Sequence, residues 1–309
     1  MKKIITTITL FATCFASINA QNTDTKYSEK VRVNATNFHQ NFSTGDFDKN
    51  GPLVNDKIYV NSNNAIVIGR DKFVARIKRF HTPFPTLKLK DRIIIVDENN
   101  VGLLYIMQGT QDGPYGAIPP GGKKINVYAA EFFTMDDEAK MKELLTITQL
   151  DHLVKQIKGD ENVNEYETVS MLPIAKSDVK NKKLLKKAIE SYVQNFNSRD
   201  WNALDALLDN NVKVNWNGKI GAGKQAVKEG LNKYTTILPD LTFHLERNVV
   251  EGNRGALAYT MIGISNADNK SQTKRVEAKE GAHFLFNKAG KIIEMVVVSN
   301  TDDIQNQLK

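Results

Sequence analysis

Residues 53–61 read LVNDKIYVN, and residues 207–215 read LLDNNVKVN. The two stretches lie 154 residues apart (207 minus 53), and this offset aligns the chain with itself without a gap from residue 40 to residue 110. Further on the offset falls to 151, because the loop QDGPYGAIPPGG in the first half corresponds to the shorter SNADNKSQT in the second. A long internal repeat of this kind predicts two copies of one folding unit.

Each copy shows the same change of apolar spacing along its length. Two amphipathic helices come first, with apolar residues at i, i+4 and i+7 spacing. Their apolar stripes are Val31, Ala35, Phe38, Phe42 and Phe73, Ile77, Phe80 in the first copy, and Leu185, Ile189, Tyr192, Phe196 and Val227, Leu231, Tyr234 in the second.

The spacing then changes to that of strands. The predicted strands are 86–96, 101–111, 123–135 and 140–149, with partners at 240–250, 255–265, 273–286 and 291–299. Helices followed by consecutive strands predict an α+β fold, in which the helices cover one face of a curved, mostly antiparallel sheet.

We predict a signal peptide over residues 1–20, a first domain over 21–158, a linker over 159–183 and a second domain over 184–309. Two lysines, an apolar run and a small residue at Ala20 are typical of a cleaved secretory signal. Cleavage after Ala20 makes the protein exported, to the periplasm or the outside of the cell. A lipid-anchored start at Cys14 is the alternative, and no membrane-spanning segment is expected because the apolar run is too short.

Composition excludes several classes of site. Cys14 is the only cysteine, so the mature chain has no disulfide, no thiolate metal site and no cysteine nucleophile. The formal charge of +7 falls to +5 when Lys2 and Lys3 are removed. Much of the remaining surplus lies in the lysine-rich stretch 176–187, which we interpret as a solvated linker that leads into a helix. We therefore expect no nucleic-acid partner.

A nucleotide site is also excluded, although residues 217–226 read NGKIGAGKQA. The spacing of Gly218, Gly223 and Lys224 is that of a phosphate-binding loop, but the next residue is Gln225 instead of a hydroxyl residue. The first copy retains no such pattern around Gly69, so the repeated glycine is a structural turn between a strand and a helix. Four histidines show no metal-ligand spacing with one another or with nearby carboxylates: His39, His81, His152 and His244. We expect neither a metal nor another cofactor.

Three successive blocks resemble the SnoaL-like polyketide cyclases, which belong to the cone-shaped superfamily named after nuclear transport factor two. They are GRDKFVARIKRFHTPFPTLKLK (69–90), MQGTQDGPYGAIPPGGKKINVYAAEFF (107–133) and KMKELLTITQLDHLVKQIKG (140–159). The second copy lacks the proline-rich loop. The resemblance implies two cones, each a bent sheet wrapped around an apolar pocket that helices close. Characterised relatives close a polyketide ring by an intramolecular aldol step.

This resemblance also locates the expected catalytic positions. Relatives carry an aspartate in the last strand, and the corresponding residues here are Gln149 and Asn300. A histidine near the start of the barrel in relatives corresponds to Asn61 and Asn215. Amides cannot accept the proton that the aspartate would take. Both exchanges favour recognition by hydrogen bonds over proton transfer.

Glu131 is the remaining candidate acid or base, since relatives carry an acidic residue toward the cavity in this strand. Phe133 lies beside it, and burial among such residues raises the pKa of a carboxyl group. Its counterpart is Ala282, and the neighbouring His283 is a candidate for the second pocket. Further candidate lining residues alternate along one strand of each copy: Tyr105 and Met107, and Tyr259 and Met261.

Three functional hypotheses follow. The first is a protein that binds a small hydrophobic or aromatic molecule, with the catalytic aspartate replaced in both copies. The second is an active cyclase, isomerase or hydrolase that uses Glu131 as general base. The third is a protein-binding module. In each case we expect the two domains to pack together as an internal pseudo-dimer, an arrangement that is compatible with a monomeric chain.

Overall fold

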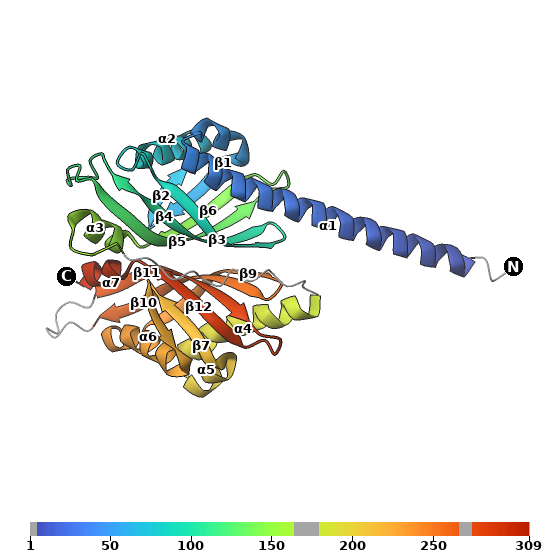
Figure 1. Cartoon of the computed structure of the whole chain (residues 1–309). Helices are drawn as coiled ribbons and strands as arrows, with labels where there is room; N and C mark the ends of the chain where they lie inside the picture. Colours follow the sequence, from blue (N-terminus) through green and yellow to red (C-terminus); the bar gives the residue numbers. More distant parts are fainter. Residues whose placement is uncertain (1–4, 164–178, 266–273, 309) are drawn as a thin grey trace.

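The structure is a computed structural model that describes residues 5–163, 179–265 and 274–308. Each half of the chain contains one six-stranded sheet. The two sheets lie back to back in the middle of the molecule, and most of the helices lie on the sides that face away from the other sheet (Figure 1). This arrangement confirms the α+β fold and the two copies that the repeat predicts.

The elements follow the same order in both halves. The first domain contains α1 (Ile5–Thr44), η1 (Phe47–Leu53), β1 (Val54–Ser62), β2 (Ala65–Ile68), α2 (Arg70–His81), β3 (Lys88–Asp97), β4 (Asn100–Gln111), β5 (Lys123–Met135), β6 (Met141–Thr148) and α3 (Leu150–Lys158). The second contains α4 (Val179–Asn197), α5 (Trp201–Leu207), β7 (Leu208–Trp216), β8 (Lys219–Ala222), α6 (Gly223–Ile237), β9 (Thr242–Glu251), β10 (Arg254–Ser265), β11 (Lys274–Phe286), β12 (Ile292–Ser299) and α7 (Thr301–Leu308).

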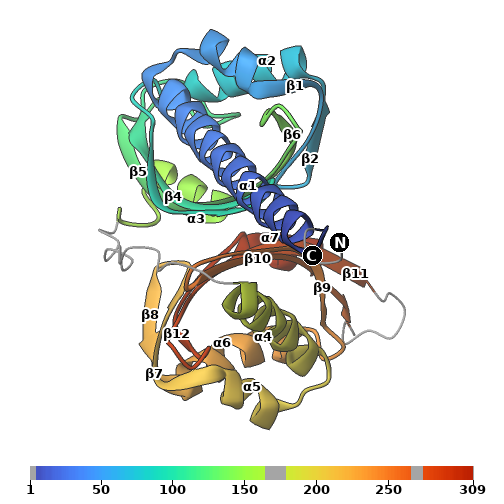
Figure 2. The same cartoon turned by 90° about the vertical axis from the view of Figure 1, so that its right-hand side faces the viewer.

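Both sheets have the same topology, with strand orders β2-β1-β6-β5-β4-β3 and β8-β7-β12-β11-β10-β9. Neighbouring strands are antiparallel except for the pairs β1–β6 and β7–β12, which are parallel. The long antiparallel strands curve around the helical layer. Figure 2 shows α1 and α4 on the concave sides of the two sheets.

The repeated stretch that aligns the two halves forms β1 and β7, and each of these strands enters a tight hairpin. Two residues with positive φ angles form each turn, Asn63 and Asn64 (φ 49° and 66°) in the first domain and Asn217 and Gly218 (51° and 92°) in the second. Two-residue hairpin turns favour asparagine and glycine because both tolerate this conformation. Gly218, the first glycine of the phosphate-loop-like pattern, therefore has a structural role in the hairpin turn between β7 and β8.

The predicted boundaries near the chain ends can be compared only in part. Residues 1–4 of the predicted signal lie outside the described residues, and α1 runs through the predicted cleavage point at Ala20 without a break. Most of the predicted linker also lies outside them, and α4 begins at Val179, inside the predicted linker range. Within the described ranges, no helix combines the length and apolar character needed to cross a membrane.

The convex faces of the two sheets, which point away from α1 and α4, form one apolar interface. Structurally equivalent residues meet in it. A Cβ atom added to Gly102 would lie 2.6 Å from the Cβ of Ala256. Ala256 is the residue of the second domain that is equivalent to Gly102. The ring centres of Phe132 and His283, also equivalent, lie 6.0 Å apart, with an angle of 29° between the ring planes. Contact between a position and its own equivalent is the mark of a two-fold, isologous interface. The two domains thus form an internal pseudo-dimer.

Hydrogen bonds at the edge of this interface obey the same symmetry. The backbone N–H of Val96 donates to Glu251 at 2.8 Å, and the N–H of the equivalent Val250 donates to Asp97 at 3.3 Å. Asp97 and Glu251 are themselves equivalent, at the ends of β3 and β9. Each sheet therefore anchors the edge strand of the other.

Basic residues of the two long helices complete both edge contacts. Arg32 of α1 pairs with Glu251, and its equivalent Lys186 of α4 pairs with Asp97 at 2.8 Å. Lys182 pairs with Asp97 as well. The interpretation of this lysine-rich stretch as a solvated linker is therefore wrong for these two lysines, which hold the second domain against the first.

Close approach at Gly102 makes the pseudo-dimer testable. We expect Gly102→Ala to lower the free energy of unfolding by about 1–3 kcal/mol, because the new methyl group overlaps Ala256. Adding Ala256→Gly should recover most of that loss, since the swap moves the methyl group to the equivalent place across the pseudo-two-fold axis. Urea unfolding of the single and double variants measures both effects. A double variant less stable than Gly102→Ala would contradict the interface.

Candidate functional site

The first domain encloses a cavity of about 280 Å³ between the concave face of its sheet and its helices. Ligand pockets usually measure roughly 300–1,000 Å³, so this space suits a small ring compound. Its wall is largely apolar, with Phe38, Phe73, Ile77, Leu89 and Met107 among the lining residues. Glu131 is the acidic residue in this wall, and Arg76 is the basic one.

Glu131 lies on the inward face of β5 and is 6% exposed. Its carboxylate accepts hydrogen bonds from the Tyr105 hydroxyl at 2.8 Å and the Thr146 hydroxyl at 3.1 Å, both at Oε1. Its other oxygen contacts Nε2 of His39 at 3.0 Å. A buried carboxylate needs such partners to offset the loss of water. Three elements besides β5 thus fix its position in the cavity wall.

His39 connects Glu131 to a second carboxylate. It lies on the buried face of α1, one residue after Phe38, and is 1% exposed. Its Nδ1 lies 2.5 Å from Oδ1 of Asp91. Burial alone would lower the pKa of His39, but the hydrogen bonds and charges of Asp91 and Glu131 raise it to about 10. At neutral pH the ring is an imidazolium between two carboxylates.

A β-bulge directs Asp91 toward this histidine. The register of β3 against β4 shifts between Asp91 and Ile93, so Arg92 is the extra residue. Asp91 consequently faces the concave side, whereas Ile93 belongs to the apolar interface between the sheets. Bulges re-aim side chains in this way, and they are frequent beside functional sites.

Arg76 is the available cation of the cavity. It lies on α2, and its side chain lines the cavity that Glu131 also lines. Among the described residues, no hydrogen bond or ion pair engages its guanidinium group. The equivalent residue in the second domain is Gly230. The cavity therefore combines a fixed buried carboxylate with a cation whose donors are free to contact a ligand.

The second domain buries a carboxylate at a different place. Glu280 of β11 is 0% exposed and accepts hydrogen bonds from Tyr259 and, at 2.8 Å, from Tyr234. Burial raises the pKa of Glu280 to about 7, although the tyrosine and Ser299 hydroxyls oppose the shift. Such a pKa would suit a base, but the tyrosine rings separate this carboxylate from solvent. Access has to come before pKa in judging a catalytic group.

Aromatic rings occupy the interior of the second domain. Phe243 replaces Leu89 and stacks on Phe196 with ring centres 3.7 Å apart. Tyr259 and Met261, which were predicted to line a pocket, are buried in this apolar core. In the first domain Tyr105 and Met107 do line the cavity. Phe133 lies behind them, edge-on to His39.

The four amide side chains that were predicted to line the pockets lie elsewhere in the structure. Gln149 is 0% exposed, and its side-chain oxygen accepts the backbone N–H of Tyr128 at 2.7 Å, which ties the start of α3 to β5. Asn61 and Asn215 accept backbone N–H groups within the two hairpin turns. Asn300 precedes α7, and its Oδ1 atom is buried without a hydrogen-bond partner in the described part of the chain. None of the four is among the residues that line the first cavity.

The prediction that His283 lines the second pocket is wrong. Successive residues of a strand point to opposite faces, so the neighbour of the inward-facing Ala282 must point outward. His283 packs against Phe132 in the interface between the sheets. Burial and the charge of Arg254 lower the pKa of His283 to about 3, so its ring is neutral.

Four functional candidates escaped the sequence reasoning: His39, Asp91, Arg76 and Glu280. His39 had a usable signal, since it lies four residues after Ala35 on the buried stripe of the first helix. Asp91 had none, because its direction depends on the bulge. In the described ranges, no group of three His, Cys, Asp or Glu side chains is arranged to hold a metal ion.

Comparison with known families matches both halves of the chain. Residues 33–157 match the family described as SnoaL-like polyketide cyclase, and residues 189–295 match the SnoaL-like domain. No curated protein sequence matches the chain.

Solved structures resemble the chain over one domain's length. A protein described as a SnoaL-like polyketide cyclase from Jannaschia sp. CCS1 is 21% identical, with 42% of this chain and 93% of that chain covered and a TM-score of 0.40. A protein described as a SnoaL-like polyketide cyclase from Agrobacterium tumefaciens C58 is 23% identical, with 40% of this chain and 98% of that chain covered and a TM-score of 0.34. TsrD from Streptomyces laurentii is 20% identical, with 42% of this chain and 95% of that chain covered and a TM-score of 0.39. With both domain matches, the chain belongs to the SnoaL-like family and carries two of its domains in tandem.

Proposed function

We propose that the first domain catalyses proton transfer at a carbon next to a carbonyl group, in a small ring compound held in its cavity. The observation that carries this proposal is the carboxylate of Glu131, which is buried in the cavity wall and held by Tyr105, Thr146 and His39. A base fixed in this way loses little entropy when it reacts.

The proposed reaction is an aldol ring closure or the related isomerisation. Glu131 takes the proton from the carbon, and negative charge develops on the carbonyl oxygen. In ring closure, the enolate carbon then forms a bond to a second carbonyl carbon of the same molecule. The proton on Glu131 returns to the resulting alkoxide, so the step needs no oxidant or reductant. The family match to polyketide cyclases supports this chemistry.

Two groups of the chain would assist. The charge of His39 keeps the carboxylate of Glu131 aligned, because the ring contacts Glu131 on one side and Asp91 on the other. Arg76, which has no partner among the described residues, would stabilise the oxygen on which charge develops. Donors aimed at such an oxygen are usually a large contribution to catalysis.

Catalysis takes precedence over the two other hypotheses for structural reasons. Binding without catalysis rested on the amides at Gln149 and Asn300, and neither lines the cavity. A protein-binding module would use an apolar outer sheet face, but the outer faces of the two sheets cover each other. Export of the protein remains a proposal, supported by the signal-like pattern of residues 1–20.

The role of Glu131 can be tested with 2-tetralone, a bicyclic ketone, by following exchange of its α-protons in D₂O by NMR. We expect the native protein to accelerate exchange and Glu131→Gln to lose about 10²–10⁴ of that rate, because the amide cannot accept a proton. Glu138→Gln, which makes the same change at an exposed carboxylate, is the control. Equal rates for native protein and Glu131→Gln would refute the assignment.

The role of Arg76 gives a separate prediction in the same assay. Arg76→Met should lower the exchange rate by about 10²-fold, the usual effect of losing one donor to a developing oxyanion. Arg76→Lys should keep part of the rate, since it retains the charge. Arg79→Met changes an arginine on the same helix that does not line the cavity and should leave the rate unchanged. A rate loss common to Arg76→Met and Arg79→Met would argue against the assignment.

A further inference from the structure

A second pocket lies at the open end of the second domain, with a volume of about 570 Å³. Six of its lining positions are equivalent to lining positions of the first cavity, at the offset of 154 residues. The equivalent pairs are Val60 and Val214, Ser62 and Trp216, Asn63 and Asn217, Ala65 and Lys219, Arg76 and Gly230, and Phe80 and Tyr234. We call this space the mouth pocket.

Three substitutions in the second copy move the space outward. Trp216 stands where the first copy has Ser62, and its half-buried ring packs against the apolar core of the second domain. Gly230 makes room for that ring, because a Cβ atom there would lie 2.3 Å from the indole. Tyr234 forms the floor, and its hydroxyl is fixed by Glu280. The result is a rigid aromatic wall in place of a deep cavity.

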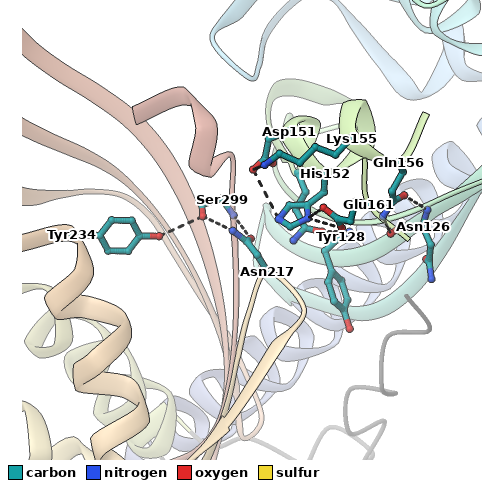
Figure 3. A network of polar contacts seen from close by, with 11 residues as sticks. Asn126, Tyr128, Asp151, His152, Lys155, Gln156, Glu161, Asn217, Tyr234 and Ser299 are labelled. Carbon is teal, nitrogen blue, oxygen red and sulfur yellow. Dashed lines mark hydrogen bonds and ion pairs between the residues drawn. The ribbon is translucent and has the colours of Figure 1, made fainter. Parts of the chain in front are cut away.

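Polar contacts hold the base of the mouth pocket in place. Asn217 donates to the hydroxyl of Ser299 at 2.9 Å, and its side-chain oxygen accepts the backbone N–H of Ser299 at 2.9 Å. The Tyr234 hydroxyl lies 3.5 Å from the same serine hydroxyl. Figure 3 shows this chain of contacts opposite the α3 residues Asp151, His152 and Lys155.

The opposite wall comes from the first domain. His152 and Lys155 of α3 line the mouth pocket, and Ile304 of α7, which belongs to the second domain, lines it as well. The ring of His152 pairs with Glu161 at 2.8 Å, which holds it in place. A molecule in the mouth pocket would therefore contact both domains.

The charge of the mouth pocket is positive. Its lining residues include Lys155, Lys219 and Lys233 but a single acidic residue, Glu229. Lys155 pairs with Asp151 at 4.0 Å, which leaves the charge of the other two lysines. No ion pair or hydrogen bond within the described ranges engages Lys219 or Lys233. Apolar side chains of Ile220 and Ile237 complete the wall beside Trp216. Lysines around an aromatic and apolar surface suit a ligand with an apolar ring and a negative charge.

We propose that the mouth pocket binds a small aromatic carboxylate. The ring packs against Trp216 and the isoleucines, and the carboxylate lies beside Lys219 and Lys233. This site is separate from the cavity of Glu131 and does not depend on the catalytic proposal.

The two tryptophans of the chain permit a local test. Trp201→Phe leaves Trp216 as the source of the indole ¹H–¹⁵N NMR signal. We expect 1-naphthoate to shift this signal saturably, and the neutral isostere 1-naphthamide to bind about tenfold more weakly. No shift, or equal affinity for the acid and the amide, would overturn the proposal.

Lysine variants locate the carboxylate. Lys219→Met with Lys233→Met, in the Trp201→Phe background, should weaken 1-naphthoate binding about tenfold. The control pair, Lys213→Met with Lys224→Met, removes two lysines of the same domain that do not line the mouth pocket. Its affinity should equal that of the Trp201→Phe protein. Equal weakening by both pairs would show a general charge effect and would also overturn the proposal.

Discussion

The pairing of His39 with Asp91 and Glu131 is the interaction on which the interior of the first domain depends. Burial of a single charge costs several kcal/mol, and the cost is offset only by close partners with good hydrogen bonds. Here an imidazolium lies between two carboxylates at 2.5 and 3.0 Å. The helix stripe brings His39 inside, and a β-bulge turns Asp91 toward it. Removing His39 would leave two neighbouring carboxylates without the cation that they share, and removing either carboxylate would leave His39 with a single charged partner.

Back-to-back packing of the sheets leaves the two concave sides free to diverge. Because equivalent residues meet in the interface, a change of size on one side must be matched on the other, as Gly102 and Ala256 illustrate. The concave sides carry no such constraint. One keeps a cavity with Glu131 and Arg76 in its wall, and the other is filled by aromatic rings and carries its pocket at the mouth. Helix α3 borders both spaces, through Leu150 on one side and Lys155 on the other.

The sequence predicts the repeat, the fold class and the buried helix stripes because each depends on spacing within a short stretch. It also points to Glu131, through the resemblance to relatives that carry an acidic residue toward the cavity in this strand. It does not reveal Asp91, because one extra residue in β3 reverses the direction of every side chain beyond it. The prediction that Gln149 lines the pocket is wrong for a related reason. Alignment gives the position of a side chain along the chain, whereas its hydrogen bond to the backbone of β5 decides where it points.

The most direct measurement of the central claim is the protonation state of His39. Histidine-selective ¹⁵N labelling gives signals for the five histidine rings, and His39→Gln identifies the one in question. The account predicts that both ring nitrogens of His39 stay protonated up to about pH 9, since its carboxylate partners raise the pKa to about 10. Loss of a proton from His39 near pH 6.5, the value of an unperturbed histidine, would contradict the account.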